Sequence, residues 1–117
     1  METRQQLGQL GERVATEHLT RSGWTILERN YRRKGAEIDI VAVDDSQTTV
    51  FVEVRTRRFG ATGGSFESIT AKKFERIRRA AAMWLEEQAD KRPVRIDAIG
   101  VNIRGNQATI THRRGIA

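Results

Sequence analysis

The chain has 117 residues and a net charge of +6 at pH 7, and it contains no cysteine. This length predicts one domain, over residues 1–117. The lack of cysteine excludes disulfides and cysteine-ligated zinc, and it is typical of a reducing cytoplasm, the compartment that we expect. The apolar runs are too short to cross a bilayer and the first residues lack the apolar core of a signal peptide, so no membrane partner is expected.

Hydrophobic periodicity predicts the order α-β-β-β-α-β-β along the chain. Residues 3–21 have apolar positions at helical spacing, and Gly23 suits a left-handed C-terminal cap. Thr70 is a suitable N-cap for a second helix over residues 71–89. Strands are predicted at 24–30, 37–43, 50–56, 94–103 and 108–111, where β-branched and aromatic residues are enriched. The order favours a mixed α/β sheet with helices on both faces.

Glycines at two places carry predictions of their own. Gly8 and Gly11 each cost the first helix about 1 kcal/mol relative to alanine, so we predict that they allow close approach to another backbone. Glu12 would then lie on a packed face, where a carboxylate needs a partner, and a surface pairing with Arg13 is the alternative. Residues 59–66 follow the third strand and contain three glycines, and we predict a mobile flap there.

The second and third strands are predicted to form a hairpin, closed by the turn-forming residues 44–48. Symmetric pairing about Ser46 makes one face of the hairpin apolar. On the other face Asp39 lies opposite Glu53, with Cβ atoms roughly 4.5–5.5 Å apart. The predicted pairs are Ile38–Val54, Ile40–Val52, Ala42–Val50, Val41–Phe51, Asp39–Glu53 and Glu37–Arg55.

Two carboxylates placed side by side repel each other unless something neutralises them. A hard divalent cation such as Mg2+ accepts carboxylate, carbonyl and water oxygens. Val41 and Phe51 lie on the same face as the acidic pair, which favours a metal site over a solvated face. Pairing of Asp39 and Glu53 with arginines on such a face is the alternative, and a slip of one residue in the register would remove the site.

Basic residues cluster around the predicted hairpin and along the second helix. Each cluster alone fits a solvated surface, but several of them flanking one hairpin favour a groove for a phosphate backbone. Lys73 borders the apolar stripe of the second helix, so its long stem can carry the ammonium group to the sheet. The residues predicted to bind nucleic acid are Arg32, Arg33, Arg57, Arg58, Lys72 and Arg76.

The fourth predicted strand is expected to carry a structural ion pair, and the two histidines are expected to carry no chemistry. Arg95 and Asp97 share one strand face, which predicts a structural ion pair. His18 and His112 lack metal-ligand spacing, and we assign them no chemistry.

Taken in chain order, these acidic residues resemble the motif of the PD-(D/E)xK nuclease superfamily: Glu12 in the first helix, Asp39, then Glu53-Val54-Arg55. The closer resemblance is to the YraN family of small bacterial proteins, which is similar to archaeal Holliday-junction resolvases. The stretches that carry it include GWTILERNYR, GAEIDIVAVD, FVEVRTRR and VRIDAIGV, so it spans nearly the whole chain. The resemblance implies a restriction-endonuclease-like fold.

The resemblance also implies a metal-dependent endonuclease that hydrolyses phosphodiester bonds in DNA, favoured over RNA, with branched DNA as a candidate substrate. Asp39 and Glu53 would hold Mg2+ or Mn2+ together with the backbone carbonyl of Val54. Glu12 would bind the ion directly or through water.

The chain departs from the family pattern at Arg55, where the family has lysine. Arginine keeps the positive charge and can stabilise a transition state, but it cannot release a proton at physiological pH. Lys73 can take the role of that lysine instead. The sequence therefore leaves three functions open: a nuclease, a nucleic-acid-binding module that has lost the chemistry, and an adaptor in a larger complex. It also leaves open whether the chain forms a homodimer.

Overall fold

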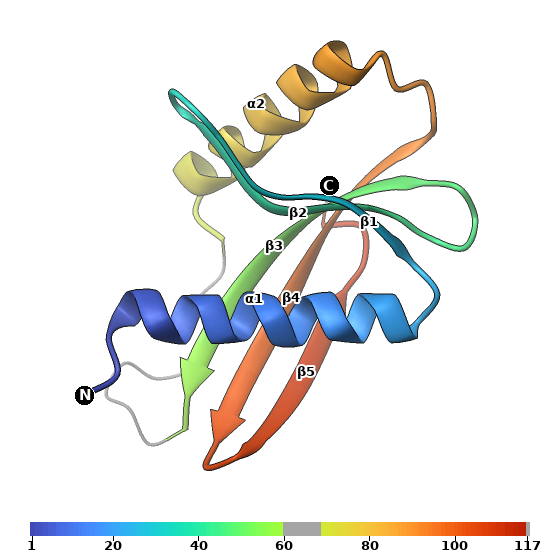
Figure 1. Cartoon of the computed structure of the whole chain (residues 1–117). Helices are drawn as coiled ribbons and strands as arrows, with labels where there is room; N and C mark the ends of the chain where they lie inside the picture. Colours follow the sequence, from blue (N-terminus) through green and yellow to red (C-terminus); the bar gives the residue numbers. More distant parts are fainter. Residues whose placement is uncertain (60–68, 117) are drawn as a thin grey trace.

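In a computed structural model, which describes residues 1–59 and 69–116, one five-stranded sheet carries a helix on each face (Figure 1). This confirms the predicted mixed α/β class and the predicted order of elements. The predicted flap lies outside the described residues except for Phe59. No helix in the described part of the chain is long and apolar enough to cross a membrane. The elements are α1 (Arg4–Arg21), β1 (Thr25–Arg33), β2 (Ala36–Val43), β3 (Thr49–Arg58), α2 (Ala71–Gln88), β4 (Val94–Arg104) and β5 (Gln107–Arg113).

The helices begin and end where their capping residues predict. Thr3 closes a capping box with Gln6 at the start of α1, and Gly23 follows α1 with a φ of 88°. The side chain of Thr70 accepts a hydrogen bond from the backbone N–H of Lys73, so it is the predicted N-cap of α2.

The strands lie in the order β1-β2-β3-β4-β5, and only β3 and β4 run parallel to each other. The parallel pair is joined through α2, as a crossover requires. Between β2 and β3 the predicted register is confirmed, because Ile40 pairs with Val52 and Val41 with Phe51.

This ladder ends at the Ile40–Val52 pair, which corrects part of the predicted hairpin. Beyond it β2 pairs with β1 and β3 pairs with β4, so Ile38–Val54, Asp39–Glu53 and Glu37–Arg55 are not ladder pairs. Figure 1 shows the β1–β2 hairpin turning away from β3 toward α2. Two-stranded ribbons twist strongly, and the turn moves Ile38 into the core under α2 rather than the core under α1.

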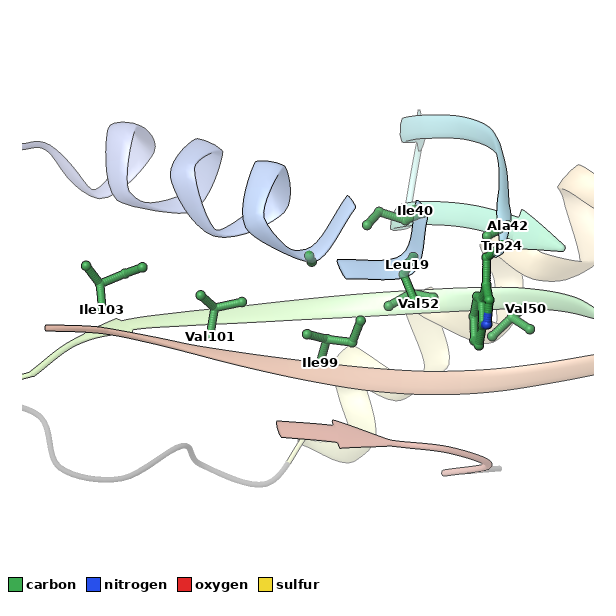
Figure 2. Close-up of a cluster of buried hydrophobic side chains, with 10 residues drawn as sticks. Leu19, Trp24, Ile40, Ala42, Val50, Val52, Ile99, Val101 and Ile103 are labelled. Carbon is green, nitrogen blue, oxygen red and sulfur yellow. The ribbon is translucent and has the colours of Figure 1, made fainter. Parts of the chain in front are cut away.

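Each helix covers its own apolar core. Under α1 the core contains Ala15 and Leu19 with side chains from the three central strands, and Figure 2 shows Leu19 together with the apolar side chains of those strands. Under α2 the core contains Ile77 and Trp84, with Phe51 against the Trp84 ring at 5.7 Å between ring centroids. A helix therefore packs on each face of the sheet, as predicted.

Gly11 is the point at which α1 comes closest to β3. A Cβ atom on Gly11 would overlap the hydroxyl of Thr56 and lie 2.7 Å from the Cβ of Thr56, whereas a Cβ on Gly8 would meet nothing within 4 Å. The predicted close approach is therefore confirmed at Gly11, against a side chain rather than backbone, and is wrong at Gly8. The contact brings the turn of α1 that carries Glu12 close to β3.

We expect Gly11→Ala to destabilise the fold by about 1–3 kcal/mol, because the overlap with Thr56 outweighs the gain in helix propensity. Gly8→Ala is the matched control in the same helix, and we expect it to stabilise the fold by up to about 1 kcal/mol. Urea unfolding monitored by circular dichroism measures both changes. Equal effects of the two substitutions would contradict the close approach of α1 to β3.

Candidate metal and nucleic-acid site

Side chains from three elements meet at the point where β2 and β3 separate, and a fourth element places a carboxyl group within electrostatic reach of Asp39. Asp39 comes from β2, Glu53 from β3, Lys73 from α2 and Glu12 from α1. Asp39 and Glu53 are buried, with 8% and 3% of their surface exposed. The end of the β2–β3 ladder thus opens a gap in the sheet that charged side chains fill.

Asp39 is held in place by the backbone of β3. Its Oδ2 accepts a hydrogen bond of 2.7 Å from the N–H of Val54, which takes the place of the next ladder bond. Its Oδ1 lies 3.7 Å from Nη2 of Arg32. The side chain therefore points at β3 although the two strands no longer pair there.

Glu53 is the most strongly perturbed carboxyl group of the site. Burial, then the negative charge of Asp39, raises its pKa from 4.5 to about 8, while Lys73 acts in the opposite direction. Its Oε1 lies 3.4 Å from Nζ of Lys73, and its Oε2 is buried without a hydrogen-bond partner in the described part of the chain. The predicted neighbouring carboxyl groups are present, and at neutral pH Glu53 keeps a proton unless a cation replaces it.

Glu12 faces the same gap from α1. Its Oε1 is buried and has no hydrogen-bond partner among residues 1–59 and 69–116. Burial, then the charge of Asp39, raises the pKa of Glu12, while Arg29, Arg32 and Asn30 act in the opposite direction. No ion pair with Arg13 occurs in the described structure, so the surface alternative is not observed there.

Lys73 reaches the sheet from the first turn of α2, as its place beside the apolar stripe predicts. Its Nζ donates to Oε1 of Glu37 at 2.7 Å and lies 3.4 Å from Glu53. Burial opposes its charge, but the hydrogen bond to Glu37 and the charge of Glu53 outweigh that effect and raise the pKa of Lys73. It therefore remains a cation at neutral pH.

The gap contains oxygen atoms of the kind that bind hard divalent cations. Asp39 and Glu53 supply two carboxylates and Val54 supplies a neighbouring backbone carbonyl, while Glu12 and Glu53 each have a buried oxygen without a partner. Among the described residues no three Asp, Glu, His or Cys side chains are gathered closely enough to hold one ion by themselves. An ion bound by Asp39 and Glu53 would therefore need water among its ligands.

A family model described as "Uncharacterised protein family UPF0102" matches residues 11–101, from Gly11 past the middle of β4. The chain belongs to the UPF0102 family. A UPF0102 protein of Mycobacterium avium is 48% identical over 118 residues, covering 97% of this chain and 91% of that protein. One of Mycobacterium tuberculosis, strain H37Rv, is 42% identical over 120 residues, covering 97% of this chain and 94% of that protein.

The match confirms the resemblance to the YraN proteins at the level of the family. The relatives carry the name "UPF0102 protein" and no activity, so membership of the nuclease superfamily does not follow from it. The chemistry of this UPF0102 chain has to be inferred from its own site.

Three of the predicted nucleic-acid-binding residues of the UPF0102 chain lie toward this gap or along α2. Arg32 lies 3.4 Å from Glu37 and 3.7 Å from Asp39, and Arg76 lies 4.0 Å from Glu37. Lys72 is exposed in the first turn of α2. Arg32 and Arg76 thus partly neutralise the acidic gap itself.

The other predicted basic residues lie apart from one another. Arg33 pairs with Glu87 at 3.2 Å, and Arg58 makes two hydrogen bonds of 2.7 Å to Glu2. Arg57 is half-buried, and its Nε lacks a hydrogen-bond partner in the described part. Arg57 and Arg58 are neighbours on β3, so their side chains point to opposite faces of the sheet.

Arg55 lies two residues beyond Glu53 on β3, which places it on the same face of the sheet. It pairs along the backbone with Gly100 of β4 and forms no ion pair within the described residues. The structure thus brings Lys73, rather than Arg55, into contact with Glu53.

A second polar cluster, which sequence reasoning found only in part, ties β4 to β5. The predicted ion pair between Arg95 and Asp97 is confirmed by contacts of 2.8 and 3.2 Å. His112 also lies 2.8 Å from Asp97, and Arg95 lies 2.9 Å from Asp44. His112 pairs with Ile99 on β4, one step diagonally from Asp97, so folding the β4–β5 hairpin about its turn would have found this contact.

Proposed function

We propose that this UPF0102 protein is a metal-dependent endonuclease with a restriction-endonuclease-like PD-(D/E)xK fold. Its substrate would be DNA, with branched DNA first among the candidates, and it would act in the cytoplasm, where DNA lies. The observation that carries the proposal is the meeting of Asp39 and Glu53, two buried carboxyl groups, where β2 and β3 separate. An arrangement of this kind is costly to folding, and it is typical of sites that bind a cation.

Asp39, Glu53 and the carbonyl of Val54 would hold Mg2+ or Mn2+, with Glu12 acting through water. A bound divalent ion supplies a water of lowered pKa and neutralises charge on the scissile phosphate. The hydrogen bond from Val54 to Asp39 fixes the direction of one carboxylate before the ion binds. Lys73 lies 3.4 Å from Glu53, so its ammonium group would be close enough to the site to contact the phosphate.

Lys73 and Arg55 would both act as fixed positive charges. Burial opposes the charge of Lys73, but the hydrogen bond to Glu37 and the charge of Glu53 raise its pKa, so Lys73 is a cation at neutral pH in the metal-free protein. Arg55 cannot release its proton at all. Both would therefore stabilise the negative charge that develops on the phosphate, and the attacking water would lose its proton to solvent or to a carboxylate.

A nucleic-acid-binding module without catalysis is the second candidate. Arg55 stands where the resembling family has lysine, and Lys73 donates a hydrogen bond to Glu37 that holds its ammonium group at that carboxylate. Both observations favour a protein that kept the fold and the cationic surface and lost the hydrolysis step.

A cleavage screen with Mg2+ or Mn2+ over four-way junctions, flaps, single strands and RNA separates the candidates. We expect cleavage of at least one DNA substrate, its loss in Asp39→Asn, and unchanged activity in Glu17→Gln, a control on the exposed side of α1. Binding without cleavage by the wild type would support the module instead. Failure to retard any nucleic acid would support an adaptor.

A further inference from the structure

Three strands present small and polar side chains on the sheet face that carries Glu53. Residues paired directly across neighbouring strands point to the same face. Their pairing forms three rows, which together we name the β3–β5 strip. The rows are Glu53–Ala98–Arg113, Arg55–Gly100–Thr111 and Arg57–Asn102–Thr109.

The two faces of these strands differ sharply in composition. The opposite face carries Ile99, Val101 and Ile103 in the core under α1. On the strip side α2 packs chiefly over β2, not over β4 and β5. Thr111 and Arg113 are exposed, and Gly100 is half-buried although it lies in a central strand. The side chains of the strip are therefore not needed to fill an apolar core.

The chemistry of the strip suits phosphate and sugar. Arg55, Arg57 and Arg113 supply charge, and side chains two residues apart on one strand are about 6.6 Å apart. The Nε of Arg57 is buried and has no acceptor among the described residues. None of the nine residues is aromatic, so the strip lacks the aromatic platforms on which bases stack. Contacts here would fix the position of a strand without reading its sequence.

We propose that the β3–β5 strip carries the phosphate backbone of a nucleic-acid strand to the gap that holds Asp39 and Glu53. The proposal rests on the proposed function, because the row that begins at Glu53 joins the strip to that site. Arg57 and Arg113 are the phosphate contacts, and Gly100 is the place where the backbone passes closest to the sheet. No part of this path runs over Arg33 or Arg58, which other carboxylates already hold.

Fluorescence anisotropy of a labelled DNA duplex, measured in EDTA over a range of salt, tests the strip without requiring cleavage. Each of Arg57→Gln and Arg113→Gln is expected to reduce the slope of log K against log salt by about 0.9, the value for one phosphate contact. Arg13→Gln removes the same charge from the exposed side of α1 and is expected to leave the slope unchanged.

The outcomes separate this inference from the proposed function. If the wild type binds and cleaves DNA while both strip variants keep the wild-type salt slope, the role of the strip is contradicted and the proposed nuclease function is not. If Asp39→Asn loses cleavage but keeps the wild-type salt slope, the proposed function is supported. If Arg57→Gln and Arg113→Gln lower that slope, the strip is supported as well. Binding of an acidic peptide with no binding of nucleic acid would overturn the strip as a phosphate path.

Discussion

Glu53→Gln is expected to reduce metal-dependent DNA cleavage at least about 100-fold while leaving the fold intact. Mutation of residues that only support metal ligands typically lowers metal affinity or activity by roughly 10–100-fold. Mutation of a ligand itself is expected to lower activity by at least as much. Glutamine keeps the size of the side chain and removes the charge that an ion needs. Cleavage rates under single-turnover conditions measure the loss, with Glu17→Gln as control. Retention of wild-type cleavage would exclude Glu53 from the chemistry.

The same substitution is expected to change how the stability of the metal-free protein depends on pH. The folded-state pKa of Glu53, about 8, lies above its ordinary value of 4.5, so the folded protein binds the extra proton. Its contribution to stability therefore falls as pH rises from 4.5 to about 8 and is constant above that. At about 1.36 kcal/mol per pKa unit the loss amounts to a few kcal/mol.

Urea unfolding in EDTA, at pH values below, within and above this window, checks the expectation. The wild type should lose stability across the window relative to Glu53→Gln, and the two should converge at its acid end. Parallel curves for the two proteins would mean that Glu53 ionises normally and that the strain between the two carboxyl groups is absent.

Asp97→Ala is expected to destabilise the protein by about 3–5 kcal/mol, the range for removing one partner of a buried ion pair. Asp97 has no exposed surface and accepts hydrogen bonds from Arg95 and from the backbone of Gly115, with His112 at 2.8 Å. Domains of this size have only about 5–15 kcal/mol of stability in total. Asp45→Ala, in an exposed turn, is the control.

Acid should weaken the same cluster in the wild type. Burial opposes the charge of Asp97, but hydrogen bonds from His112, Arg95 and Gly115 lower its pKa from 3.8 to about 2. Its contribution is therefore complete above pH 3.8 and is lost as pH falls through about 2. Thermal unfolding of wild type and Asp97→Ala over this range measures it. A melting temperature for Asp97→Ala within a few degrees of the wild type at neutral pH would show that the cluster contributes little to stability.

The elements of this chain could be predicted because local signals agree with the fold. Thr70 and Gly23 cap the helices as expected, and the turn after Val43 sets the register that Ile40 and Val52 confirm. The register was sufficient to place Asp39 near Glu53. A strand pattern with period two therefore predicted the central feature of the site.

The remaining errors come from long-range packing. Alternation along β2 gave no sign that its ladder with β3 would stop at Ile40, since the twist of the β1–β2 hairpin decides that. Gly8 and Gly11 look alike in sequence, and only the position of Thr56 distinguishes them. The contact of Arg58 with Glu2 could not be predicted either, because the two residues are distant in the sequence.

Calorimetric titration with Mn2+ tests the central claim most directly, namely that Asp39 and Glu53 together bind a divalent ion. We expect the wild type to bind Mn2+ at one site, Asp39→Asn to lose that binding, and Asp45→Asn to retain it. Equal binding heats for wild type and Asp39→Asn, with both proteins folded, would contradict the metal site and the nuclease built on it.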